Sequence, residues 1–161
     1  MPNILHFSAS TSVKNLFGRG LVTDQIAAVF ELVKNSYDAD ATEVNIILSG
    51  INSNTPSITI SDDGIGMDLN DIERRWMIIG TDSKRNEMFS PIFNRPLNGD
   101  KGIGRFSVDR LGSILHMETQ KCNSGEKYLV DFDWSAFDGE SRNISDIDIP
   151  YSTQNSGNLH G

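Results

Sequence analysis

The chain has 161 residues, of which 37% are hydrophobic, and a formal net charge of −8 at pH 7. This length is enough for one domain with a buried core and short for two, and the acidic balance argues against a nucleic-acid-binding domain, which usually carries a basic face. The single cysteine, Cys122, excludes an internal disulfide, and no apolar run reaches the roughly 18 residues of a membrane span. We therefore expect residues 1–161 to form one cytoplasmic domain without a membrane segment.

The clearest predicted helix covers residues 24–37. Apolar side chains recur along it at helical spacing, and this stripe is expected to face the core. The stripe consists of Ile26, Phe30, Val33 and Tyr37. Polar residues form a neighbouring stripe, which is the arrangement expected at the rim of a pocket.

Two strands and a second helix are predicted next. Residues 43–49 and 57–61 alternate apolar and polar side chains, and the turn-forming residues 50–56 between them indicate a hairpin. Asp68 is followed by Asp71 three residues later, which is typical of a capped helix start. We expect this second helix to cover residues 69–79.

Periodicity disappears over residues 81–101, and an irregular segment of this length in a compact domain is usually a functional lid or disordered. Helical spacing returns over residues 103–114, and two further strands are predicted at 115–120 and 127–134. Because these elements lack a regular βαβ repeat, we expect an α+β fold. Its two layers would be a mixed, mainly antiparallel sheet and helices covering one face.

Three short motifs occur in one order: Glu31–Ala39 (ELVKNSYDA), Asp62–Met67 (DDGIGM) and Gly99–Gly104 (GDKGIG). The first aligns two carboxylates and an amide on one helix stripe. The other two are glycine-rich turns, whose backbone can approach a ligand and donate amides to phosphate. Taken singly, these motifs also fit a solvated helix face and ordinary tight turns. Neither the P-loop pattern nor the Rossmann pattern occurs in the chain.

Together the three motifs resemble the N box and the two glycine boxes of the GHKL superfamily over residues 20–135. This superfamily includes gyrase-type topoisomerases, heat-shock-protein-90-type chaperones, histidine kinases and MutL proteins, and it has the Bergerat ATP-binding fold. The resemblance implies that Glu31 is the catalytic base and that Asn35 holds a Mg²⁺ ion bound to ATP. It also implies that Asp62 accepts a hydrogen bond from the adenine amino group.

The resemblance implies further ATP contacts on all three motifs and on the segment 81–101, which would act as the lid. The residues concerned are Asp38, Gly64, Gly66, Met67, Thr81, Lys84, Gly99, Lys101, Gly102, Ile103, Gly104, Arg105 and Phe106. From the residues alone, Lys101 and Arg105 fit surface cations as well as phosphate contacts.

The sequence Asn-Ser-x-Asp-Ala in the N box is most similar to MutL, MORC and heat-shock-type ATPases. This resemblance implies slow Mg²⁺-dependent ATP hydrolysis that drives a conformational change or dimer closure in a larger protein. We expect the chain to be the N-terminal module of such a protein, with low activity by itself and a downstream partner that the sequence does not name. Two alternatives stay open: a histidine-kinase-type catalytic domain and an ATP-binding regulatory module without hydrolysis.

Overall fold

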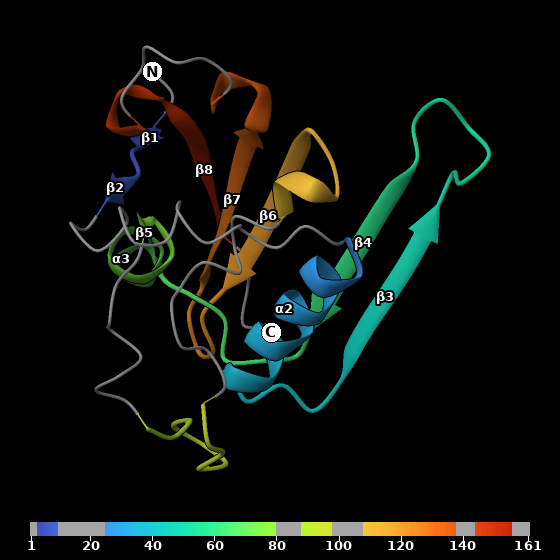
Figure 1. The fold of residues 1–161 in the computed structure, drawn as a ribbon. Coiled ribbons are helices and arrows are strands. Elements are labelled where there is room, and N and C mark those ends of the chain that lie inside the picture. Colours follow the sequence, from blue (N-terminus) through green and yellow to red (C-terminus); the bar gives the residue numbers. More distant parts are fainter. Residues whose placement is uncertain (1–2, 10–24, 80–87, 98–107, 138–143, 156–161) are drawn as a thin grey trace.

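A computed structural model describes residues 3–9, 25–79, 88–97, 108–137 and 144–155 (Figure 1). Its main sheet has four antiparallel strands in the order β1–β8–β7–β6. These strands are β1 (Asn3–Leu5), β6 (Ile114–Gln120), β7 (Glu126–Asp133) and β8 (Ile149–Asn155). The predicted pairing of the strands near 115–120 and 127–134 is confirmed, whereas β1 and β8 were not predicted.

The core lies against this sheet and is rich in aromatic side chains. Phe132 of β7 is at its centre, with ring centroids 4.7 Å from Trp76, 5.6 Å from Trp134 and 6.0 Å from Phe7. Such offset and tilted ring pairs add stabilisation to that of apolar burial. Ile149 of β8 is also almost fully buried in the same cluster.

Helix α2 (Gln25–Asp38) confirms the predicted helix over 24–37 in its described part, but the prediction of its buried face is wrong. Ile26 and Phe30 are 65% and 64% exposed, whereas Ala28 and Ser36 are buried and Leu32 packs against the core. These three inward residues are spaced by four. The small side chains at positions 28 and 36 let the helix approach its neighbours closely, which the larger residues of the predicted stripe would prevent.

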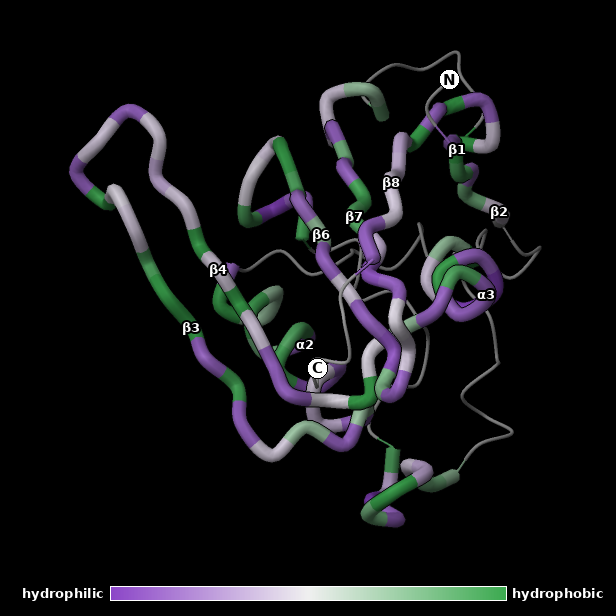
Figure 2. The backbone as a smooth tube through the Cα atoms, turned by 180° about the vertical axis from the view of Figure 1, so that it is seen from behind, coloured by the Kyte–Doolittle hydropathy of each residue, from purple (hydrophilic) through white to green (hydrophobic). Residues whose placement is uncertain are grey.

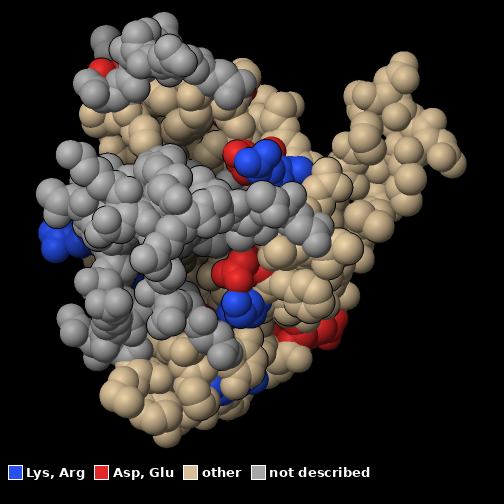
Figure 3. All heavy atoms as spheres, in the orientation of Figure 1, with Lys and Arg blue, Asp and Glu red and all other residues tan. Residues whose placement is uncertain are grey.

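Strands β3 (Val44–Ser49) and β4 (Ser57–Asp62) form the predicted hairpin, in which Ile46 lies opposite Ile60. The hairpin is a separate two-stranded sheet that projects from the rest of the molecule (Figure 1), and α2 lies beside its base. Apolar residues recur along β3 (Figure 2). Residues 44–61 carry no charge, and the projecting part of the hairpin shows neither sign in Figure 3.

The predicted helix over 69–79 is shorter than expected. Its capping box is present at Asp68 and Asp71, but α3 covers only Leu69–Asp71 and continues as a π-helical turn over Ile72–Trp76. Residues 78–79 then form strand β5 (Ile78–Ile79), which pairs in parallel with β2 (Ser8–Ala9). This pairing is with a segment about 70 residues away in sequence, so local periodicity could not indicate it.

The predicted helix over 103–114 is also wrong in its described part, because residues 108–110 form a 3₁₀ turn and Ile114 already belongs to β6. Pairing of Ile114 with Asp133 of β7 overrides the local helical spacing. Residues 103–107 lie outside the described part of the chain. The mainly antiparallel, mixed α+β architecture is nevertheless confirmed.

Candidate functional site

Glu31, Asn35 and Asp38 lie on the second half of α2, as the helical spacing predicts. The Asn35 side chain is exposed, and those of Glu31 and Asp38 are half-buried. Glu31 forms an ion pair with Lys34, one turn further along the helix, at 2.6 Å between Oε1 and Nζ. The first motif therefore presents an amide oxygen and two carboxylates on the second half of the helix, and Lys34 is paired with the Glu31 carboxylate.

Asp62, at the end of β4, is connected to this helix by a hydrogen bond. Ser36 Oγ donates to Asp62 Oδ2 at 2.7 Å, and the backbone N–H of Gly64 donates to Oδ1 at 3.0 Å. The Asp62 residue remains exposed, and each carboxylate oxygen has a second lone pair that a ligand donor can use. The first two motifs thus meet at Asp62. Ser36 was not predicted as a site residue, although it stands inside the first motif.

Gly64 and Gly66 are required by the protein's own packing. A Cβ added at Gly64 would lie 2.8 Å from the carbonyl oxygen of Ala39, and one added at Gly66 would lie 1.8 Å from that of Gln120. Gly66 also has φ +61°, which L side chains rarely adopt. The glycines allow residues 64–66 to pass between the end of α2 and the end of β6. Packing within the protein thus gives a reason for these two glycines that is independent of the ligand contacts predicted for them.

Asp63, which was not predicted as a functional residue, fixes the same loop to the start of β3. Its carboxylate accepts hydrogen bonds from the hydroxyl group of Thr42 and from the backbone N–H groups of Thr42 at 2.7 Å and Glu43 at 2.8 Å. The hydroxyl bond from Thr42, followed by the two backbone bonds, lowers the pKa of Asp63 to about 2. Asp63 is therefore ionised at neutral pH and holds the glycine-rich loop against the residues that precede β3.

Contacts with the end of β6 and with the turn that follows it hold the other end of the loop. The backbone N–H of Met67 donates to Thr119 Oγ1 at 2.9 Å, and that of Cys122 donates to the carbonyl oxygen of Ile65 at 2.8 Å. Lys121 Nζ lies 2.6 Å from Asp68 Oδ2 and 2.7 Å from Asp71 Oδ2. Lys121 lowers the pKa of Asp68, whose charge in turn raises the pKa of the lysine. The second motif is therefore fixed at both ends.

Several predicted site residues lie outside the described part of the chain. They are Thr81, Lys84, Gly99, Lys101, Gly102, Ile103, Gly104, Arg105 and Phe106. Of the predicted lid, only residues 88–97 are described. The structure thus brings together the first and second motifs, and the position of the third stays a prediction.

The described residues contain no group of three or more His, Cys, Asp or Glu side chains that could hold a metal ion. The described ranges therefore offer no cluster of such side chains as a magnesium site. The exposed amide of Asn35 fits a different arrangement, in which one neutral protein oxygen joins phosphate and water oxygens around Mg²⁺.

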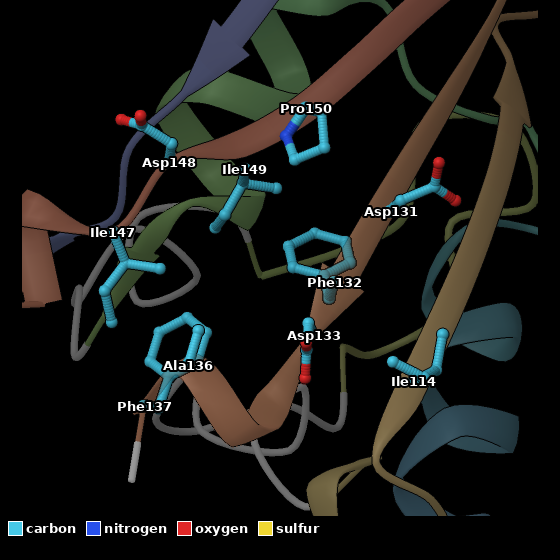
Figure 4. A pocket seen from close by; sticks show the side chains of 10 residues that line it. All are labelled: Ile114, Asp131, Phe132, Asp133, Ala136, Phe137, Ile147, Asp148, Ile149 and Pro150. Atoms are coloured by element: carbon cyan, nitrogen blue, oxygen red, sulfur yellow. The ribbon is translucent and has the colours of Figure 1, made fainter. Parts of the chain in front are cut away.

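A shallow cavity of about 150 Å³ lies on another part of the molecule (Figure 4). Its lining consists of Ile114, Asp131, Phe132, Asp133, Ala136, Phe137, Ile147, Asp148, Ile149 and Pro150. The carboxylates of Asp131 and Asp148 stand at its edge and point away from Phe132 (Figure 4). None of these residues belongs to the three motifs, and this cavity is not the candidate site.

Comparisons with known proteins identify the family of the chain. A family model described as histidine kinase-, DNA gyrase B- and HSP90-like ATPase matches residues 23–159. The chain belongs to this ATPase family. The resemblance of the three motifs to GHKL proteins is thereby confirmed, and membership supports ATP binding. Among the described residues, no helix has both the length and the apolar character needed to cross a membrane.

Two curated proteins are similar to part of this chain. HgiDII of Herpetosiphon aurantiacus, whose name assigns it to the type II restriction enzymes, is 34% identical over 118 residues, or 73% of this chain and 18% of the relative. The DNA mismatch repair protein MutL of Rickettsia canadensis is 45% identical over 65 residues, or 40% of this chain and 10% of the relative. The chain therefore spans less than a fifth of the length of either relative.

Proposed function

We propose that the chain binds Mg²⁺-ATP between the second half of α2 and the loop 62–67. The observation that carries this proposal is the hydrogen bond from Ser36 to Asp62, because it joins the two motifs and aims an exposed carboxylate. Asp62 would accept the hydrogen bond of the adenine amino group. The same position disfavours guanine, whose carbonyl oxygen would face the carboxylate.

In this proposal the phosphates extend from Asp62 toward Glu31, Asn35 and Asp38. Mg²⁺ held by Asn35 and by phosphate oxygens would neutralise charge on the triphosphate. Glu31 lies one helical turn before Asn35, and its carboxylate would orient a water molecule and take its proton as the water attacks the terminal phosphate. Release of Glu31 from Lys34 would precede this step.

The remaining predicted contacts complete the site. Gly64, Gly66 and Met67 would face the base and ribose, and Gly99, Gly102 and Gly104 would donate backbone amides to the phosphates. Lys84, Lys101 and Arg105 would balance the negative charge of the nucleotide in a chain that is acidic as a whole. In a larger protein, hydrolysis would be slow and would drive a conformational change or closure of a homodimer.

One observation favours a second candidate function, an ATP-binding regulatory module without hydrolysis. The Glu31 carboxylate forms an ion pair with Lys34, and an oxygen that is paired with a cation is not free to hold the attacking water molecule. The variant Lys34→Gln separates the candidates. If the ion pair blocks hydrolysis, this variant should hydrolyse ATP faster than wild type; if hydrolysis already occurs, its rate should change little.

The experiment that tests the proposal is titration calorimetry of the chain with ATP and GTP, each with Mg²⁺ and with a chelator. We expect ATP to bind more tightly than GTP and Mg²⁺ to strengthen ATP binding. Single-turnover measurement with excess protein then determines whether bound ATP is hydrolysed. Equal affinity for ATP and GTP, or no binding of either, would overturn the proposal.

A further inference from the structure

Residues 88–97, inside the predicted lid, form a closed turn. Phe89 and Pro96 make an isolated β-bridge, and the backbone N–H of Ser90 donates to the carbonyl oxygen of Arg95 at 2.8 Å. A second backbone bond of 3.1 Å runs from Leu97 to Met88. The described part of this segment is thus a small folded unit, where the sequence predicted an irregular loop.

A single carboxylate attaches this turn to the end of α2. Asp40, which is 4% exposed, accepts hydrogen bonds from Ser90 Oγ at 2.5 Å and from the backbone N–H groups of Ile92 at 2.8 Å and Phe93 at 3.2 Å. Burial alone would raise the pKa of Asp40, but these three bonds and the nearby charge of Arg95 together lower it. The buried carboxylate is therefore charged and satisfied by the turn.

Arg95, which belongs to the turn, makes a second attachment to the end of α2. Its Nη1 donates to the carbonyl oxygen of Ala41 at 2.7 Å and to that of Tyr37 at 3.3 Å. The guanidinium group also lies 4.8 Å from the ring centroid of Tyr37 and 4.7 Å from that of Phe93. Asp40 and Arg95 together form what we call the clasp between α2 and residues 88–97.

The backbone of Asp40 indicates what this carboxylate is for. Its φ is +62°, a left-handed conformation that glycine adopts most readily and that aspartate adopts less readily than glycine does. Glycine would suit this backbone conformation better than aspartate does. The aspartate side chain, however, accepts three hydrogen bonds from a segment about 50 residues away, and these bonds have no role in ending the helix.

The clasp connects two segments that are adjacent in sequence to the first and third motifs. Asp40 follows Asp38 of the first motif by two residues, and Leu97 precedes Gly99 of the third motif by two. With residues 88–97 anchored, Gly102 is 5 positions after the last described residue of this segment, Leu97. Without the anchor, it is 23 positions after Ile79. Because loop-closure entropy grows with the logarithm of loop length, the anchor makes it easier to bring the third motif to the phosphates.

We propose that Asp40 is a positioning residue for the triphosphate: through the clasp it holds residues 88–97 against the N-box helix and so raises the affinity for ATP over adenosine. This role rests on the proposed function. The difference in loop length corresponds to an affinity change of about 3- to 10-fold. Adenosine has no phosphates, so its binding at Asp62 does not need the clasp.

The test compares Asp40→Gly with wild type. Glycine suits the backbone at position 40, so this variant removes the carboxylate while relieving strain and should fold. We expect the ratio of ATP to adenosine affinity to fall about 3- to 10-fold and amide exchange over 88–97 to become faster. Ser90→Ala should produce the same changes to a smaller extent, because two of the three hydrogen bonds remain.

Asp133→Ala is the matched control, since Asp133 also accepts a backbone and a hydroxyl hydrogen bond, from Ser135, but lies away from the clasp. It should lower stability and leave the affinity ratio unchanged. If Asp40→Gly accelerates exchange over 88–97 without changing the ratio, the positioning role is overturned. Equal losses of ATP and adenosine affinity would also overturn it. A wild-type chain that binds neither ATP nor adenosine would refute the proposed function itself.

Discussion

In the four-stranded sheet, Val130, Phe132 and Ile149 are at most 1% exposed, whereas in the β3–β4 hairpin Ile46, Ile47 and Leu48 are between 47% and 61% exposed. Apolar burial therefore stabilises the sheet half of the molecule. The half that carries the first two motifs is held largely by hydrogen bonds to carboxylates, at Asp40, Asp62, Asp63 and Asp68. A scaffold and a site that depend on different forces should respond separately to mutation.

The largest effect should come from the sheet half. Phe132→Ala removes a ring that packs against three other aromatic rings, and we expect it to lower the free energy of unfolding by about 3–5 kcal/mol. Ile47→Ala, in the exposed hairpin, should lower it by less than about 1 kcal/mol. Urea denaturation followed by circular dichroism measures both. Equal losses would contradict the distinction between the two halves.

The next effect concerns catalysis and should leave the scaffold unchanged. If Glu31 is the general base, Glu31→Ala should slow ATP hydrolysis about 100-fold, or about 2.7 kcal/mol of transition-state stabilisation, with little loss of ATP affinity. Single-turnover kinetics and calorimetry on the same samples separate the two quantities. Glu73→Ala, an exposed acidic residue of the π-helical turn, is the control. Undiminished hydrolysis without Glu31 would place the base elsewhere.

Nucleotide selection should depend on Asp62. In Asp62→Asn an amide NH₂ group replaces one carboxylate oxygen, so it opposes a donor from Ser36 or Gly64 and weakens acceptance of the adenine amino group. We expect ATP affinity to fall about 10-fold, or about 1.4 kcal/mol, with a small change in the free energy of unfolding. Asp148→Asn, remote from the motifs, should bind ATP as wild type does. Unchanged affinity in Asp62→Asn would refute the adenine contact.

The same contrast explains which features the sequence could predict. The hairpin, α2 and the β6–β7 pair follow from periodicities within one segment, and the motif spacing indicated the family. Strands β1 and β8 and the pairing of β5 with β2 depend on partners far along the chain, so no local pattern carries them. The helix expected over 103–114 fails at Ile114 for the same reason.

Residues of the candidate site could be predicted where they stand in a motif, but not where contacts between distant segments determine their role. Glu31, Asn35 and Asp62 stand in motifs, and their neighbourhood could be inferred before their contacts were known. Asp40 and Asp63 also stand inside or beside these motifs, yet their roles depend on donors 50 and about 20 residues away. Asp40 has a positive φ, which glycine adopts more readily than aspartate does. This unusual backbone angle points to a role for the side chain, and only the structure reveals it.

The smallest effect should be the pH dependence that Asp63 adds to the motif half. Hydrogen bonds from Thr42 and Glu43 lower its pKa from 3.8 to about 2 in the folded chain, so the folded state favours the ionised carboxylate. The stabilisation is fully present above about pH 4 and is lost as the pH falls through about 2. Because the group is exposed to solvent, we expect this contribution to be small beside that of Phe132.

Thr42→Val tests this contribution without changing any charge, since it removes the hydroxyl donor, the main cause of the lowered pKa, and keeps the β-branched shape. The difference in urea midpoint between wild type and Thr42→Val should be constant from pH 5 to 7 and should shrink as the pH is lowered from 4 to 2. Asp63→Asn should follow the same course. A difference that grows toward low pH would have the wrong sign for a carboxylate stabilised in its ionised form, and would show that Asp63 does not hold the loop as described.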